Sequence, residues 1–301
     1  HAEQTAKIMV EFEKVVLKEK PDVVIVAGDV NSTIACALVA VKLHIKVAHI
    51  EAGCRSFDRT MPEEINRILT DAISDYLFAL DYDSLKNLKK EGVEKNKIFL
   101  VGDIMIDSLK FGIEKIKNDN RILDLYKLDK KNYCVLTMHR PSNVDDENKL
   151  YEIFKILKEI QNEIKVVFPV HPRTLKNMKK FKKVNSLLKT CENIILTEPL
   201  GYFDFLNLFG KSKFVLTDSG SVQQETSFLN IPCLTLRKNT ERNITVLKGT
   251  NELVGSDREK IIYFWNQIKK NKFKKSKKIG LWDGKTSERI VKVLLDFIPA
   301  K

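Results

Sequence analysis

The chain has 301 residues, enough for about two domains of ordinary size. Hydrophobic residues make up 43% and charged residues 31%, which excludes disordered, collagen-like and fibrous classes. The net charge is +12, but twelve lysines lie in two short segments, 176–183 and 269–278. No nucleic-acid-binding motif accompanies them, so we interpret both as solvated helix faces and expect no nucleic acid partner.

Three sequence features indicate where in the cell the protein is expected: its hydropathy, its cysteines and its first residue. No apolar run reaches the roughly 18 residues of a membrane helix, because Lys42 and Lys46 interrupt the longest one, so no membrane association is expected. The five cysteines are widely spaced without a CxxC pair, which indicates reduced thiols and a cytoplasmic location. Residue 1 is His rather than Met, and we expect a processed or cut start.

Short apolar runs alternate with longer segments of helical periodicity along the chain. The runs predict nine strands, at 23–27, 46–50, 76–79, 98–101, 133–137, 165–170, 194–196, 214–217 and 233–236. The periodic segments predict helices at 5–20, 32–43, 62–73, 84–91, 147–161, 202–210, 222–229 and 258–269. This alternation is typical of an α/β fold whose parallel sheets are covered by helices on both faces.

The alternation lapses at 117–131, where Asn, Asp and Lys accumulate, and we predict the domain boundary there. Residues 1–116 are expected to form one Rossmann-like domain and residues 117–282 a second, with a C-terminal helix at 283–301 returning to the first. Ligands of such folds bind at the carboxyl ends of the strands. Polar residues that directly follow strands are therefore expected to face a central cleft.

In the predicted first domain, acidic residues follow the strands or begin a helix. Asp29 and Glu51 end two strands, and a carboxylate there must be paired, desolvated or functional. Glu63 and Glu64 begin a helix, where they could equally be partners of the helix dipole.

Basic residues take the corresponding places in the second half. His139 and Arg140 follow one strand and His171 follows another, and His139 is the stronger catalytic candidate. The turn 218–221, with sequence DSGS, leads into a helix and has the pattern of an anion site, although Ser and Gly there could simply cap the helix. Arg242 offers a further cation for a diphosphate.

The motifs in order resemble one family over about residues 4–254. They are GDV at 28–30, HIEAGCRS at 49–56, PEEINR at 62–67, TMHR at 137–140, VHPR at 170–173, DSG at 218–220 and TER at 240–242. Together they resemble the non-hydrolysing UDP-N-acetylglucosamine 2-epimerases, whose hydrolysing relatives differ at 51–56.

The resemblance implies a glycosyltransferase-B-like fold of two Rossmann-like domains, with UDP bound mainly by the second. It implies interconversion of UDP-N-acetylglucosamine and UDP-N-acetylmannosamine by elimination and re-addition of UDP, without NAD or a metal, in a homodimer that serves polysaccharide biosynthesis. The family's opening strand and its Gly-Thr-Arg-Pro-Glu turn have no counterpart here, so the N-terminal domain is expected to be incomplete.

By resemblance, the catalytic residues are Asp29, Glu51, Glu63 and His139, with the carboxylate that takes the C2 proton left open. The implied substrate and UDP contacts are Arg140, His171, Phe205, Ser219, Gly220, Glu225 and Arg242, with Glu225 at the ribose and Phe205 beside the uracil. The chain departs from the family at Ser221, Gln224 and Asn243, which replace Gly, Glu and Pro. Two alternatives stay open: a UDP-sugar glycosyltransferase of the same fold, and a truncated remnant that binds UDP without activity.

Overall fold

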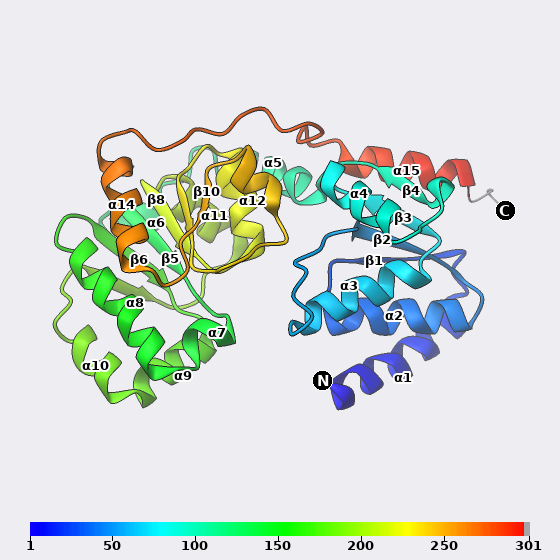
Figure 1. Ribbon diagram of the computed structural model, residues 1–301, viewed down its shortest axis with the longest axis horizontal. Helices are drawn as coiled ribbons and strands as arrows, with labels where there is room; N and C mark the ends of the chain where they lie inside the picture. Colours follow the sequence, from blue (N-terminus) through cyan, green and yellow to red (C-terminus); the bar gives the residue numbers. More distant parts are fainter. Residues whose placement is uncertain (298–301) are drawn as a thin grey trace. The chain divides into compact units, whose positions relative to one another are not determined.

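The computed structural model describes residues 1–297 and divides into two compact units. Unit 1 comprises His1–Ser108 and the chain from Gly280 onward, and unit 2 comprises Leu109–Ile279. The chain passes from one to the other within helix α5 (Ile104–Ile116) (Figure 1). Residues 298–301 of the expected C-terminal helix lie outside the described residues.

Unit 1 is a parallel sheet with strand order β1-β2-β3-β4, flanked by helices. Its elements are α1 (Ala2–Glu19), β1 (Val23–Ala27), α2 (Asn31–Lys42), β2 (Lys46–Ala52), α3 (Pro62–Ile73), β3 (Tyr76–Ala79), α4 (Tyr82–Lys90), the short 3-10 helix η1 (Lys95–Lys97), β4 (Ile98–Leu100) and α15 (Thr286–Phe297). The last helix, α15, lies beside this sheet (Figure 1). Its Ile290 is buried with Phe78, and Phe297 packs at an angle against the rings of Tyr76 and Phe99. The C-terminal segment thus completes the core of the N-terminal unit.

Unit 2 is also a parallel sheet, with strand order β10-β9-β8-β5-β6-β7. Its elements are α6 (Arg121–Leu125), β5 (Tyr133–Thr137), α7 (Pro141–Val144), α8 (Glu147–Ile160), β6 (Lys165–Pro169), α9 (Pro172–Lys180), α10 (Lys182–Leu188), β7 (Ile194–Thr197), α11 (Tyr202–Gly210), β8 (Phe214–Thr217), α12 (Gly220–Phe228), β9 (Cys233–Thr235), α13 (Asn243–Leu247), β10 (Asn251–Leu253) and α14 (Arg258–Lys269).

The core of unit 2 forms because α8 and α14 turn apolar faces toward the sheet. Phe154 of α8 lies against Phe168 of β6, and Trp265 of α14 stacks on Phe214 of β8 with ring centroids 5.0 Å apart. Both helices have an aspartate as N-cap residue: the Asp146 side chain accepts the N–H of Lys149, and the Asp257 side chain accepts that of Lys260. Such caps satisfy backbone donors that the first helical turn leaves unpaired.

All nine predicted strands are present, and their ends agree to within two residues. Strand β10 and helices α5, α6, α7, α9, α10 and α13 were not predicted. The segment 117–131 packs within unit 2, because α6 buries Ile122 and Leu123 and the Asp119 carbonyl accepts a hydrogen bond from Asn207.

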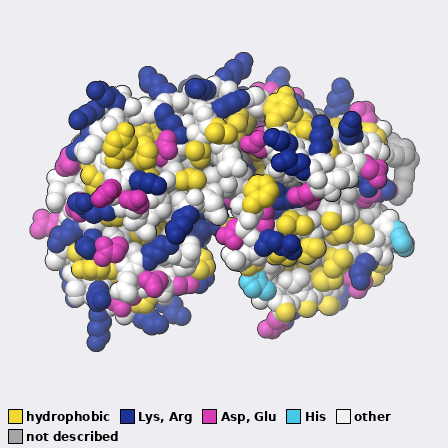
Figure 2. All heavy atoms as spheres, in the orientation of Figure 1, with side chains coloured by type: hydrophobic (Ala, Val, Ile, Leu, Met, Phe, Trp, Pro, Cys, Tyr) yellow, Lys and Arg dark blue, Asp and Glu magenta, His cyan; other side chains and the backbone are white. Residues whose placement is uncertain are grey.

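The lysine-rich segments differ in structure. Residues 176–183 lie in α9 and α10, as expected of helix faces. The helical interpretation is wrong for 272–278, which run in non-helical conformation after α14. There Lys274 donates to the Val246 carbonyl and pairs with Glu252 at 2.8 Å. On the face drawn in Figure 2, Lys and Arg side chains are interspersed with acidic and hydrophobic ones.

Within residues 1–297 we find no helix both long and apolar enough to cross a membrane.

The packing of α8 is open to a direct test. Phe154→Ala removes a fully buried ring and is expected to lower the free energy of unfolding of unit 2 by about 3–5 kcal/mol. Leu247→Ala, at a side chain that is 70% exposed, is the matched control and is expected to change it by less than about 0.5 kcal/mol. Urea unfolding followed by tryptophan fluorescence measures both, and equal effects would contradict the assigned core.

Candidate active site

Asp29 lies in the turn after β1, and Glu51 lies near the end of β2 beside the turn that follows it. The two residues are neighbours because β1 and β2 are paired in parallel. The Gly28 N–H donates to the Ile50 carbonyl at 3.2 Å and joins the two turns. Glu51 occupies a bulge, where the register of β2 with β3 shifts, and has φ of 71°. A non-glycine residue in this region costs on the order of 1–3 kcal/mol and persists only where its surroundings hold it.

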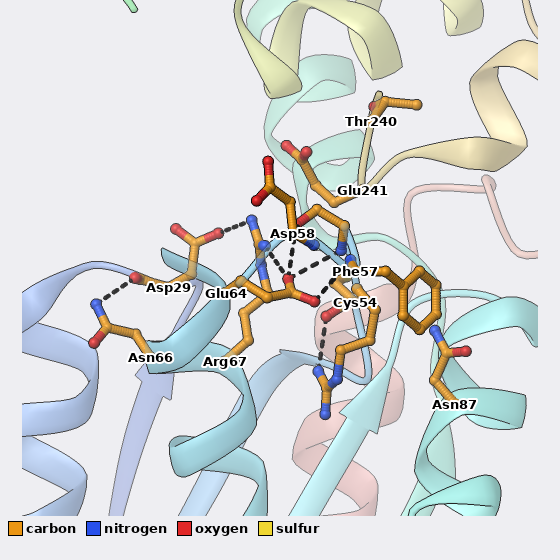
Figure 3. A network of polar contacts seen from close by, with 12 residues as sticks. Asp29, Cys54, Phe57, Asp58, Glu64, Asn66, Arg67, Asn87, Thr240 and Glu241 are labelled. Carbon is orange, nitrogen blue, oxygen red and sulfur yellow. Dashed lines mark hydrogen bonds and ion pairs between the residues drawn. The ribbon is translucent and has the colours of Figure 1, made fainter. Parts of the chain in front are cut away.

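Arg67 of α3 connects Asp29 to a buried glutamate (Figure 3). Its guanidinium donates to Asp29 Oδ2 at 2.5 Å and to Glu64 Oε2 at 2.7 Å. Glu64 also accepts the backbone N–H groups of Ser56 and Phe57, both at 2.9 Å. Burial of Glu64 opposes ionisation, but the hydrogen bonds from Ser56, Arg67 and Phe57 outweigh it and hold the pKa of this carboxyl below its ordinary value. Glu64 is thus a fixed anion that orders the chain around it.

Asp29 and Glu63 line one cavity of about 380 Å³ in unit 1. Asn66 joins them in its wall and donates from its side chain to the Asp29 carbonyl at 2.9 Å. Of the two adjacent glutamates, Glu63 is half-buried at the cavity and Glu64 is buried beneath it. The structure therefore brings Asp29 and Glu63 together, while Glu51 lies near the end of the next strand and does not line this cavity.

In unit 2, the buried carboxylate of Asp218 organises the turn that carries His139. Asp218 accepts the backbone N–H groups of His139 at 3.1 Å and Arg140 at 2.9 Å, and the side-chain amide of Asn143 at 3.0 Å. His139 Nδ1 lies 3.2 Å from Asp218 Oδ1. At this distance the negative charge of Asp218 acts directly on the His139 ring.

Partial desolvation of the ring lowers the pKa of His139 below its ordinary value, although the side chain is still 42% exposed. The negative charge of Asp218 opposes this shift, and the charges of Arg140 and His171 reinforce it. The His171 ring lies 5.6 Å from that of His139, centroid to centroid, so the two predicted histidines come together. A neutral imidazole held by a carboxylate can accept a proton and, once charged, can stabilise an adjacent anion.

The predicted anion site lies at the N-terminus of α12. Ser219 is its N-cap residue and Gly220 its first helical residue, and the Ser219 hydroxyl is 3.1 Å from that of Ser221. Arg140 lies beside this turn and donates from Nε to the Asp218 carbonyl at 3.0 Å. Backbone N–H groups at a helix N-terminus, together with an arginine, are suited to a phosphate group.

Glu225, on the same helix, is buried and accepts a hydrogen bond from the Tyr202 hydroxyl at 3.1 Å. Burial and the neighbouring charge of Glu225 raise the pKa of Tyr202 above its ordinary value, so the hydroxyl stays a donor. Phe205, one turn along α11 from Tyr202, is half-buried and packs on Phe209 with ring centroids 5.1 Å apart. Arg242 is the N-cap residue of α13 and is 8% exposed.

Arg67, Asp218 and Tyr202 hold the predicted site residues but were not predicted as site residues themselves. Arg67 and Asp218 belong to the motifs PEEINR and DSG, so their place in the sequence could have indicated a role in the site. Tyr202 lies on a different helix from Glu225 and is 23 residues away in sequence. No local sequence pattern predicts that contact.

Within residues 1–297, no group of three or more His, Cys, Asp or Glu side chains is placed to hold a metal ion.

These features define a two-unit α/β protein of the glycosyltransferase-B class, with carboxylates at strand ends in one unit and a candidate phosphate site in the other. The family model for UDP-N-acetylglucosamine 2-epimerase matches residues 1–295. The chain belongs to the UDP-N-acetylglucosamine 2-epimerase family.

Individual relatives agree with this assignment. The UDP-N-acetylglucosamine 2-epimerase of Methanocaldococcus jannaschii is 48% identical over 300 residues, which cover 98% of this chain and 81% of that protein. A crystal structure of the M. jannaschii enzyme in complex with UDP-GlcNAc and UDP superposes with a TM-score of 0.89, at 46% identity, covering 98% of this chain and 81% of that one. The UDP-2,3-diacetamido-2,3-dideoxy-D-glucuronate 2-epimerase of Pseudomonas aeruginosa is 44% identical over 265 residues, 87% of this chain and 72% of that protein.

The electrostatic link between Asp218 and His139 gives a prediction. Asp218→Asn removes the negative charge that raises the pKa of His139, so this pKa is expected to fall further below its ordinary value. A proton NMR titration of the ring measures the change. Glu159→Gln, which breaks an exposed pair between α8 and Arg258 of α14, is the control and should leave His139 unchanged. An unaltered pKa in Asp218→Asn would show that the carboxylate does not act on the ring.

Proposed function

We propose that the protein is a non-hydrolysing UDP-N-acetylglucosamine 2-epimerase that interconverts UDP-N-acetylglucosamine and UDP-N-acetylmannosamine. The observation that carries the proposal is a set of three carboxylates in unit 1: Asp29 just after β1, Glu51 near the end of β2 and Glu63 in the first turn of α3. Asp29 and Glu63 line one cavity. Family membership and the bound ligands named for the M. jannaschii structure support it. These relatives favour the epimerase over the glycosyltransferase alternative.

The reaction requires a carboxylate because the C2–H bond of the sugar is only weakly acidic. In the proposed mechanism a carboxylate takes the C2 proton, the bond from C1 to the diphosphate oxygen breaks, and a C1–C2 double bond forms as UDP leaves. UDP then adds back to C1 while a proton is delivered to C2 on the opposite face. Positioned general acids and bases contribute about 10²–10⁴-fold to such steps.

The roles divide between the two units in this proposal. Asp29, Glu51 and Glu63 handle the C2 proton, and His139 stabilises the departing UDP or exchanges a proton with it. Unit 2 binds UDP, with Ser219, Gly220 and Arg242 at the diphosphate, helped by Arg140 and His171, Glu225 at the ribose and Phe205 beside the uracil. Preorganised donors at a departing anion are an effective source of rate acceleration.

The proposal also covers the substrate range and the cellular location. The name of the P. aeruginosa relative shows that a close sequence can act on a different 2-acetamido sugar, so the N-acetylglucosamine form is the first choice and a diacetamido sugar the second. Five free cysteines support a reducing compartment, and we place the protein in the cytoplasm. The family resemblance implies a homodimer and a role in polysaccharide biosynthesis.

Hydrogen exchange at C2 tests the function directly. UDP-N-acetylglucosamine incubated with the protein in deuterated water is expected to lose its C2 proton signal and to yield the manno isomer, because the proton returned to C2 comes from solvent. Proton NMR follows both changes. A C2 proton that persists, or sugar transferred to an acceptor without inversion, would overturn the proposal.

Glu51→Gln is expected to lower kcat by about 10²–10⁴-fold, because the amide can neither take nor return a proton. UDP affinity, measured by calorimetry, should stay within about twofold, since the proposed UDP contacts all lie in unit 2. Glu11→Gln, at an exposed glutamate of α1, is the matched control and should keep full turnover. Unchanged turnover in Glu51→Gln would remove Glu51 from the mechanism.

A further inference from the structure

His49 of β2 is completely buried, and both of its ring nitrogens lie against hydrogen-bond acceptors. Nδ1 is 2.6 Å from Asp71 Oδ1, and Nε2 is 2.9 Å from the Gly28 carbonyl. A carbonyl can only accept, so Nε2 carries a proton. The second oxygen of Asp71 accepts the Gly53 N–H at 3.0 Å and lies 2.7 Å from Arg55, so Asp71 acts as an acceptor toward His49 as well. The ring is therefore an imidazolium that donates from both nitrogens.

This cluster joins the two turns that carry Asp29 and Glu51. Gly28, whose carbonyl accepts from His49, directly precedes Asp29. Gly53, whose N–H donates to Asp71, comes two residues after Glu51. Gly53 has φ of 80°, and a Cβ there would come within 2.3 Å of the Ser84 carbonyl oxygen, so its backbone has one tightly constrained path. The pair His49–Asp71 is thus a bridge from α3 to both turns.

We propose that His49 is a positioning residue, whose doubly donating ring fixes the Asp29 turn relative to the Glu51 turn through Asp71 and Gly28. The inference rests on the proposed function, because it concerns the geometry of the carboxylates assigned there. Misplacement of a reacting group by about 1 Å can cost on the order of 10² in rate, so such a bridge matters to turnover.

The surrounding charges support a cationic ring. Burial alone would lower the pKa of His49, but the hydrogen bond and charge of Asp71, the Gly28 carbonyl and the charge of Glu51 together raise it above its ordinary value. Arg55, on the far side of Asp71, donates two hydrogen bonds of 2.8 and 2.6 Å to Glu91, the C-cap residue of α4. Charged partners thus surround each buried charge, as burial requires.

The direction of the pH effect follows. Because the pKa of His49 is raised in the folded protein, the stabilisation is fully present below the ordinary histidine value of about 6.5 and is lost as the pH rises through the folded value. A neutral ring has one N–H group and must give up either Asp71 or Gly28. We therefore expect the bridge to loosen at alkaline pH.

Nitrogen NMR of the histidine rings is the first test. The His49 signal is identified by ring N–H protons that exchange slowly with water, since His49 is buried and the rings of His44, His139 and His171 are not. Both ring nitrogens are expected to be protonated at pH 7.5. A ring with one N–H at that pH would overturn the inference, whatever the protein's activity.

His49→Gln is the second test, because the glutamine side chain has no charge and has one donor nitrogen in place of the two ring nitrogens that face Asp71 and Gly28. Its kcat for C2 exchange is expected to fall by about 10–100-fold with KM and UDP affinity within about twofold, and the alkaline decline of kcat in the wild type should disappear. His44→Gln, at an exposed histidine of the same unit, is the control. A His49→Gln protein with wild-type kcat would overturn the inference.

Failures of the two proposals are distinguishable. If the wild type shows no C2 exchange, the proposed function fails and this inference fails with it. If the wild type exchanges C2 but the His49 ring is neutral or His49→Gln turns over normally, this inference alone fails. Should His49→Gln not fold, the ring protonation and the alkaline limb of the wild-type profile still decide.

Discussion

The site depends on buried carboxylates that collect the backbone donors of the turns after parallel strands. Each such turn leaves N–H groups outside the sheet ladder, and a buried carboxylate is tolerated only when several donors surround it. Glu64 receives the N–H groups of Ser56 and Phe57, and Asp218 those of His139 and Arg140. The carboxylate requires the N–H donors of the turn, and the turn requires an acceptor for them, so both are fixed in one conformation.

This arrangement separates groups that hold from groups that can react. The Glu64 side chain is 1% exposed and the Asp29 side chain 26%, although both bind the same guanidinium of Arg67. A carboxylate enclosed by donors, as Glu64 is, resists protonation and makes a poor base. Asp29 has a charged partner on one side and a cavity on the other, so it can be oriented and still reached. In unit 2 the same division holds, because the Asp218 side chain is completely buried and the His139 side chain is partly exposed.

The strands could be predicted because each run is largely apolar, and the residues that follow the strands supplied most of the candidate site residues. Strand β10 was not predicted because its residues, Asn-Glu-Leu, are mostly polar and the strand forms through its pairing with β9. The difference between Glu63 and Glu64 could not be predicted either, since neighbouring helix positions differ only in which neighbours they meet. His49 stood inside a recognised motif, but its role requires Gly28 and Asp71, which approach it only in the folded chain.

The departure at Ser221 shows how the local geometry differs between neighbouring positions of the candidate phosphate site. A Cβ at Gly220 would come within 2.6 Å of Glu241 Oε1, and Arg237 holds that carboxylate through bonds of 3.2 and 2.7 Å, so the side chain cannot easily move away. Ser221, by contrast, already carries a side chain, and its hydroxyl lies 3.1 Å from the Ser219 hydroxyl. A side chain at 220 would therefore displace the Glu241 carboxylate, whereas Ser221 shows that a side chain fits at 221. The serine adds a hydroxyl pair at the N-terminus of α12, where either oxygen can turn its proton toward an anion.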